Sequence, residues 1–148
     1  MNTQHRRADQ EKPNIISEII GEINSANKLS EVLTPDKFAP PEGWADKIAS
    51  SFKSGNNSLK TSQLRKIFSE VKSICQRQKK GISKDKTELY LLYPKLAYAK
   101  GRNLMPKEFY DLLVSCIKKL QLNGDEKDFE TFEEFMTAIV AYNKQYDK

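Results

Sequence analysis

The sequence predicts an all-α protein, a compact bundle of five or six helices with short connections. Apolar residues recur at the spacing of one helix face over several long segments. Gly, Pro, Asn and Ser gather between these segments, and no segment alternates apolar and polar residues as a strand does. The 148 residues are 38% hydrophobic and 30% charged, which is typical of a globular chain long enough to build one core.

We expect residues 1–13 to be a flexible polar tail and residues 14–148 to form a single helical-bundle domain. The first helix is expected over 14–27, with Asn14 as its N-cap. Residues 29–43 contain three prolines, so we expect a loop there, with a short turn at most. Five further helices are expected at about 44–52, 61–78, 86–100, 106–122 and 128–146.

The clearest of these is the helix over 61–78, with Thr61 or Ser62 as its cap. Its apolar face is formed by Leu64, Ile67, Phe68, Val71, Ile74 and Cys75. A break at Gly81 precedes the next helix, for which Asp85 is a candidate cap. The spacing therefore places one side of the helix over 61–78 in the core and leaves the other side to solvent.

The segment Leu91–Arg102, LLYPKLAYAKGR, is apolar on nearly every side but carries three cations and no acid. A helix that is apolar all round is typical of the middle of a bundle, so we expect this one to be central. Pro94 is expected to kink it or to start a new helical turn, and Gly101 is expected to end it. The cations at its end indicate a surface that meets negative charge.

The residue inventory argues against an enzyme. His5 is the only histidine and lies in the polar tail, which removes His-based triads and most zinc sites. No glycine-rich phosphate loop is present. Cys75 and Cys116 lack the spacing of a zinc site and are expected to be buried thiols. We therefore expect no catalytic residue, no metal and no cofactor.

Hydropathy indicates no membrane association. No apolar run approaches the about 20 residues that a membrane-spanning helix needs. The N-terminal residues are polar and lack the apolar core of a signal peptide. The expected location is the cytoplasm.

Positive charge is concentrated in the middle third of the chain. Residues 59–107 carry 13 basic and 3 acidic residues, a net charge of +10, whereas residues 1–58 sum to −1 and residues 108–148 to −4. Concentrated charge of one sign attracts a polyanion and speeds its capture. Solubilising lysines on exposed faces are the alternative that charge alone leaves open.

The helix over 61–78 predicts a basic stripe. Arg65, Lys72 and Lys79 recur every seven residues, so they line up over about 20 Å with no acid between them. Lys66 and Arg77 fall on another side, where we expect them to pair with the acid of the same helix, Glu70. An unpaired stripe matches a run of phosphates, and such contacts are blind to sequence and sensitive to salt.

Tyrosines are interleaved with the cations of the next helix. Tyr90, Tyr93 and Tyr98 lie near Lys95 and Arg102 in the sequence. Aromatic rings beside cations stack on unpaired bases. The alternative is core packing with a hydrogen-bonded hydroxyl, which we favour for both Tyr93 and Tyr98.

Three segments together resemble a known family. Thr61–Lys66 (TSQLRK), Pro94–Arg102 (PKLAYAKGR) and Ala138–Lys144 (AIVAYNK), in this order and spacing, are similar to the small helical subunit of type III-A CRISPR effector complexes, the Csm complexes. The resemblance covers roughly residues 44–146. Asn143 departs from it, since the family pattern has a histidine at that position.

The resemblance implies a small all-helical subunit with no catalytic site of its own. Several copies would stack beside the guide-carrying subunits and contact guide RNA and target RNA, while cleavage would belong to other subunits. The implied partners are these two RNAs, the other Csm subunits and copies of the chain itself. From the charge pattern and the resemblance together, the expected RNA-binding residues are Lys60, Arg65, Lys66, Lys72, Lys79, Lys95, Lys100, Arg102 and Lys144.

Two other functions stay open at this stage. One is a protein-interaction module whose basic face docks an acidic partner without direct RNA contact; the acidic stretch Asp128–Glu134 of a neighbouring copy is a candidate partner surface. The other is a DNA-binding helical regulator, which ranks last because no helix-turn-helix spacing stands out.

Overall fold

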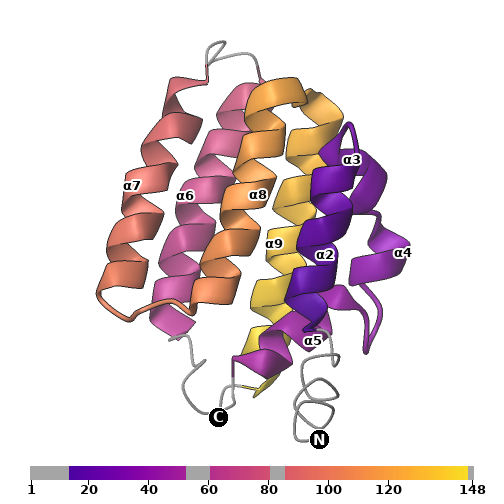
Figure 1. Ribbon diagram of the computed structural model, residues 1–148, viewed down its shortest axis with the longest axis vertical. Helices are drawn as coiled ribbons and strands as arrows, with labels where there is room; N and C mark the ends of the chain where they lie inside the picture. The colour runs from indigo at the N-terminus through magenta and orange to yellow at the C-terminus, as the bar shows by residue number, and fades with distance from the viewer. Residues whose placement is uncertain (1–13, 53–60, 81–85, 147–148) are drawn as a thin grey trace, which may run out of the picture.

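The protein is helical throughout the residues that the computed structural model describes, which are 14–52, 61–80 and 86–146. Eight helices and no strand are found in these residues (Figure 1). The helices are α2 (Ile15–Ser25), α3 (Leu29–Val32), α4 (Pro35–Phe38), α5 (Trp44–Ser51), α6 (Thr61–Lys79), α7 (Thr87–Gly101), α8 (Lys107–Asn123) and α9 (Glu126–Tyr146). The predicted all-α fold is confirmed, but the predicted count of five or six helices is too low.

The two additional helices, α3 and α4, occupy the segment that was expected to be a loop. Pro35 is the first residue of α4, a position where its missing N–H has no partner to lose and its fixed φ suits the helix. Leu29, Val32 and Phe38 are buried and fasten both short helices to the core. The prolines therefore delimit short helices in this segment.

Two helix starts test the predicted caps. Asn14 caps α2 as expected, because its side chain accepts a hydrogen bond from the Ile16 N–H at 2.8 Å. Helix α9 begins earlier than predicted, since Asp125 and Asp128 accept hydrogen bonds from each other's backbone N–H groups in a reciprocal capping pair. Thr61 already lies inside α6, so the cap of that helix, like the predicted cap Asp85, lies outside the described residues.

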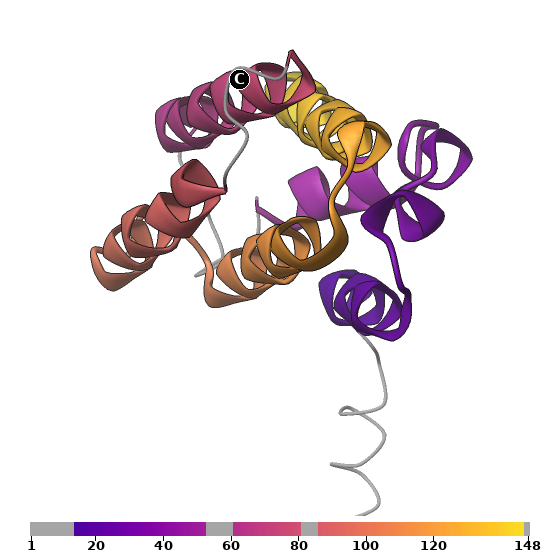
Figure 2. The same ribbon diagram turned by 90° about the horizontal axis from the view of Figure 1, so that it is seen from above.

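Helix α9 is the central helix of the bundle. It packs against α3, α4, α5, α6 and α8, and Figure 2 shows it between α6 and the short N-terminal helices. Its side chains Phe132, Phe135, Met136 and Ile139 are fully buried, and the ring of Phe135 meets that of Phe38 edge-on at 5.4 Å. The core is thus organised around the C-terminal helix.

Helix α7 lies at the edge of the bundle, so the expectation of a central position is wrong. It packs chiefly on α8, and both views place it outermost (Figures 1 and 2). One side of α7 is buried through Leu89, Leu92, Leu96 and Ala99, whereas Tyr98 on the other side is 65% exposed. The predicted core packing of Tyr98 is therefore wrong as well.

Pro94 does not interrupt α7, which runs through it. A proline inside a helix leaves the carbonyl four residues earlier without its usual donor. Here both Pro94 and the residue four positions before it, Tyr90, are exposed, so water can satisfy that carbonyl. The helix ends in a motif centred on Asn103, which has φ 61°, while the Leu104 N–H donates to the Ala99 carbonyl. The helix therefore ends at Gly101, as predicted, and Asn103, two residues later, supplies the left-handed conformation of the stop.

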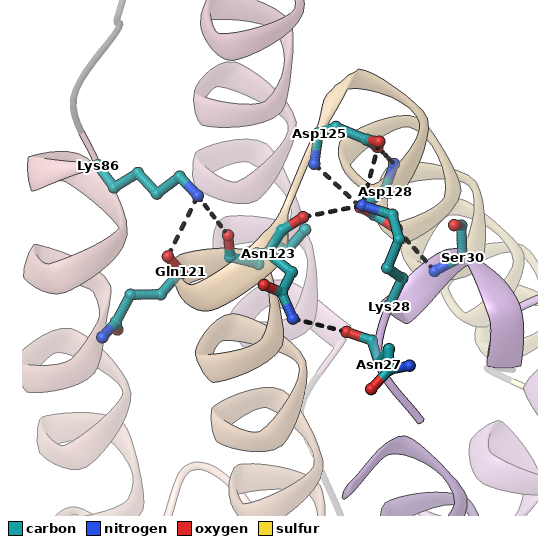
Figure 3. A network of polar contacts seen from close by, with 9 residues as sticks. Asn27, Lys28, Ser30, Lys86, Gln121, Asn123, Asp125 and Asp128 are labelled. Atoms are coloured by element: carbon teal, nitrogen blue, oxygen red, sulfur yellow. Dashed lines mark hydrogen bonds and ion pairs between the residues drawn. The ribbon is translucent and has the colours of Figure 1, made fainter. Parts of the chain in front are cut away.

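A polar network ties the connection between α2 and α3 to the turn between α8 and α9 (Figure 3). Lys28 Nζ lies 2.8 Å from Asp128 and donates to the Asn123 carbonyl at 2.9 Å, and Asp128 accepts from the Ser30 N–H at 2.8 Å. Burial alone would raise the pKa of Asp128. The hydrogen bonds from Lys28, Asp125 and Ser30 together outweigh that burial and hold the pKa well below its ordinary value. This carboxylate is therefore a structural anion.

Candidate nucleic-acid interface

A groove separates α6 from α7. It measures about 550 Å³ between the first half of α6 and the second half of α7, and a second hollow of about 380 Å³ continues it along the other halves. Its floor is apolar, because Ile67, Leu92, Leu96 and Ala99 are buried side chains. The two helices run in opposite directions across it (Figure 1).

Three of the nine predicted RNA-binding residues meet at the larger hollow. Lys66 comes from α6, Lys95 from α7, and Arg102 from the residue that follows α7. All three are exposed. Glu70 is the one acid among the residues that line this hollow, and its carboxylate lies 3.6 Å from Lys95 Nζ. Three cations against one carboxylate leave the groove positive.

Arg102 is held beside an aromatic ring. Its guanidinium carbon lies 5.6 Å from the centre of the Tyr98 ring, and its Nη1 donates to the Tyr98 hydroxyl at 3.2 Å. The backbone N–H of Arg102 also closes the last turn of α7 by donating to the Tyr98 carbonyl at 3.0 Å. The two side-chain contacts hold the guanidinium beside the Tyr98 ring, and both residues line the groove.

The ion pairs around the groove differ from those predicted. Glu70 pairs with Lys95 across the groove, and Arg77 pairs with Glu88 of α7, with Nε 3.1 Å from the carboxylate. The hydrogen bond to Glu88 raises the pKa of Arg77. The helix-local pairing of Lys66 and Arg77 with Glu70 is therefore wrong, because a neighbouring helix supplies closer partners than the same helix does.

The predicted stripe on α6 is shorter than expected. Lys79 Nζ lies 3.0 Å from Glu133 of α9, and this hydrogen bond raises the pKa of the lysine. Lys79 is thus paired within the chain, and its place in an unpaired stripe is wrong. Arg65 and Lys72 stay exposed, with Lys72 Nζ 5.9 Å from the centre of the Phe68 ring, but neither lines the groove.

The remaining predicted residues lie elsewhere. Lys100 stacks over the Tyr110 ring of α8 at 4.2 Å, on the opposite flank of α7 from the groove. Lys144 is exposed on the last turns of α9, which the Asn143–Thr61 hydrogen bond of 3.2 Å joins to the first turn of α6. Lys60 lies outside the described residues.

Sequence reasoning missed the groove residue Gln63 and favoured core packing for the groove residue Tyr98. Gln63 precedes Lys66 by three and Glu70 by seven positions, which places all three on one side of α6. That spacing was a usable signal. The cations near Tyr98 in the sequence were a signal too, but its exposure depends on α7 being at the edge of the bundle.

The described residues contain no candidate metal site, and their two thiols are buried. No group of three or more His, Cys, Asp or Glu residues that could hold a metal ion is found among them. Cys75 and Cys116 are buried, as predicted, and burial raises the pKa of the Cys75 thiol to about 12. The same part of the chain contains no helix with the length and apolarity to cross a membrane. The hydroxyl of Tyr93 donates to Gln121 at 2.8 Å, which confirms a structural role for that tyrosine.

The fold and the groove define the class: a small helical bundle that presents charge for binding. Comparison with protein families identifies the family: the model described as Csm2 Type III-A matches residues 42–148. The chain belongs to this family, and it is a structural small subunit of the type III-A CRISPR Csm effector complex rather than an enzyme. Other subunits of that complex are its partners. Searches of curated proteins and of solved structures give no match.

Proposed function

We propose that this subunit binds the RNA of the type III-A complex, guide and target, through the groove between α6 and α7. The observation that carries the proposal is the meeting of Lys66, Lys95 and Arg102 at the larger, apolar-floored hollow of the groove, which a single acid lines. A phosphate backbone supplies the negative charge that such a groove attracts.

The contacts would be to the backbone and therefore independent of sequence. Lysines and arginines that contact phosphates position a strand, but they do not distinguish one base from another. Arg65 and Lys72 on another side of α6, and Lys144 on α9, extend the positive surface beyond the groove. Because the groove lies between two helices of about 20–30 Å, one copy covers a short stretch of RNA, and stacked copies would cover more. The location that follows is the cytoplasm.

The test is fluorescence anisotropy of the purified chain with a labelled single-stranded RNA over a salt series. If about three cations neutralise three phosphates, the log–log slope is about −2. The double variant Lys66→Glu/Arg102→Glu should bind at least tenfold more weakly. The matched control is Lys47→Glu/Lys127→Glu, which changes the net charge equally at exposed positions outside the groove.

Equal weakening by the two double variants would show that net charge alone matters and would overturn the groove assignment. Binding that favours one base sequence would contradict backbone contact. Stronger binding to duplex DNA than to RNA would favour the DNA-binding regulator.

The second candidate function is docking to an acidic protein without RNA contact. The acidic stretch of a neighbouring copy is less available for this than the sequence indicated, because Asp128 and Glu133 are engaged within the chain by Lys28 and Lys79. The observation that favours protein docking lies instead on the outer side of α7.

A further inference from the structure

The outer side of α7 is uncharged although it is exposed. Seven exposed residues fall within an arc of about 120° on this helix. They are Thr87, Tyr90, Leu91, Pro94, Ala97, Tyr98 and Gly101. We call this arc the outer face of α7; its edge toward α6, formed by Leu91, Pro94 and Tyr98, also lines the groove. It includes three of the four large hydrophobic side chains that are exposed in the described part of the chain, and the fourth, Leu122 at the end of α8, is 70% exposed.

An apolar hollow of about 480 Å³ between α7 and α8 extends this face. Tyr90, Tyr93, Val114 and Leu122 line it, with Lys118 and Gln121 as its polar members. A contiguous apolar surface of this kind is uncommon on a protein that works alone and marks an interaction site. The sequence of α7 is apolar all round because its inner side packs on the bundle and its outer side forms this exposed apolar surface.

The shape of the outer face fits a helix. The residues Pro94, Ala97 and Gly101 in this arc are small or compact. A Cβ added to Gly101 would meet no atom within 4 Å, so nothing in the chain's own packing requires a glycine there. Small residues at a contact let two helix axes approach closely. Tyr90, Leu91 and Tyr98 border these residues as side chains that a partner helix can pack between.

The charges that flank the face specify the partner's chemistry. Lys100, over the Tyr110 ring, lies on the side toward α8 with Lys118 beyond it, whereas Lys95 and Arg102 on the side toward α6 belong to the groove proposed for RNA. Within α7 the only acid is Glu88, which is engaged by Arg77. A partner with carboxylates beside an apolar stripe, on the side toward α8, is complementary to this pattern.

The described residues of a second copy of the chain do not offer that pattern. Two outer faces brought together would oppose the cations of both copies. A head-to-tail contact would need another exposed apolar patch, and in residues 14–52, 61–80 and 86–146 the large exposed hydrophobic side chains all belong to α7 and the adjoining end of α8. We therefore propose that the outer face of α7 docks an apolar helix, with acidic residues on its side toward α8, of another protein subunit of the complex.

The test uses the assembled complex. The complex is co-expressed with an affinity tag on another subunit, and the amount of this chain that co-purifies is measured by mass spectrometry. Ala97→Arg places a long charged side chain on the outer face and should lower incorporation at least tenfold. The control is Ala141→Arg, the same change at an exposed alanine of α9, which should incorporate normally. Helical circular dichroism, thermal unfolding and RNA anisotropy of the isolated Ala97→Arg chain should match those of the unaltered protein.

Several outcomes would overturn the proposal. Normal incorporation of Ala97→Arg would show that no subunit covers this face. Equal loss with Ala141→Arg would show that the effect is not specific to α7. If the isolated chain forms a dimer by light scattering and Ala97→Arg makes it a monomer, a second copy covers the face. If Ala97→Arg weakens RNA binding and leaves incorporation unchanged, the face belongs to the RNA site.

Discussion

Helices α6 and α7 border one groove, yet they present different surfaces to solvent. The exposed positions of α6 are serines and cations, such as Ser62, Arg65, Lys66 and Lys72, whereas those of α7 are mostly apolar. On α6 the inner and outer sides differ in polarity, so packing and charge are separated on one helix. On α7 both sides are apolar, so its polarity pattern does not distinguish the side that meets α8 from the side that meets solvent.

The difference shows what an apolar pattern can and cannot establish. An amphipathic helix such as α6 has one side that must be buried, and the spacing of its apolar residues identifies that side. A helix apolar all round must be covered on all sides, but its own chain need not supply the whole cover. In this protein α9 occupies the centre and α7 the edge. The two helices should accordingly respond differently to the same substitutions.

The largest expected effect contrasts the inner sides of the two helices. Leu64 of α6 and Leu96 of α7 are both buried, at 0% and 2% exposure, so Asp at either position leaves a buried unpaired charge that costs about 3–5 kcal/mol. Because α6 packs on the central helix, Leu64→Asp should unfold the whole chain. Leu96→Asp should detach α7 and leave the remaining helices formed. Urea titration by circular dichroism, with hydrogen exchange resolved by segment, distinguishes the two results.

Ala97→Asp is the control for that pair, since it introduces the same residue one position along, on the outer face of α7. It should cost less than about 1 kcal/mol, mainly through helix propensity. If Leu96→Asp abolished the helical signal of the whole chain as Leu64→Asp does, α7 would be as integral to the bundle as α6, and the contrast between them would fail.

The next effect concerns the buried carboxylate of Asp128, which fastens the start of α9 to Lys28 and Ser30. Asp128 is buried and accepts several hydrogen bonds, so Asp128→Asn should lower the free energy of unfolding by about 2 kcal/mol at pH 7. The folded pKa of Asp128 lies below the ordinary value of 3.8, so its contribution is present above pH 3.8 and is lost as pH falls toward the folded pKa. The stability gap between the two proteins should therefore narrow below about pH 4.

Unfolding measured from pH 7 to pH 2 follows that gap. Glu134→Gln, at an exposed position of the same helix, is the control and should show no comparable gap at any pH. A gap that stayed constant down to pH 2 would mean that the Asp128 carboxylate does not act as an anion in the fold.

Much of this architecture follows from local spacing, and the rest depends on contacts between helices. The cap of α2 and the buried faces of α2, α6 and α8 could be predicted because each helix has one apolar side. Helices α3 and α4 could not, because four-residue helices are too short to show a period. The groove could be predicted only in part: the sequence contains Lys66, Lys95 and Arg102, but not the pairing of two helices that joins them.

The same reasoning explains the errors in the predicted ion pairs. Spacing along one helix identifies residues that are able to pair, but partners on other helices compete for them. Lys79 meets Glu133, which lies 54 positions later, and Arg77 meets Glu88 of α7. A charge census of one helix therefore overestimates how many of its cations stay available.

A third prediction separates the groove from the stripe on α6. Lys66→Glu/Arg102→Glu should weaken RNA binding at least tenfold, which is about 1.4 kcal/mol. Arg65→Glu/Lys72→Glu changes the charge equally on another side of α6 and should weaken binding by a smaller factor. Anisotropy at one fixed salt concentration compares them directly. A larger loss of RNA affinity from Arg65→Glu/Lys72→Glu would place the RNA-binding site on the side of α6 that carries Arg65 and Lys72 and not in the groove.

The smallest expected effect is a gain of binding. Glu70 is the carboxylate of the larger hollow and lies 3.6 Å from Lys95 Nζ, so Glu70→Gln removes the negative charge that competes with a phosphate for that lysine. RNA affinity should rise by about two- to threefold, because Lys95 then meets its phosphate without a competing carboxylate, and the salt slope should stay at about −2. Stability should change by less than about 1 kcal/mol, because the pair is exposed.

Glu88→Gln is the comparison for this gain, because it removes an acid of the same groove system that is paired with Arg77 rather than with Lys95. If the proposed position of the RNA is right, Glu70→Gln should raise affinity more than Glu88→Gln does. Equal gains in RNA affinity would indicate that binding depends on the total charge of α6 and α7. The larger hollow of the groove would then not be the RNA-binding site. A fall in affinity with Glu70→Gln would mean that the Glu70–Lys95 pair orients Lys95 for the phosphate, so that the carboxylate assists binding.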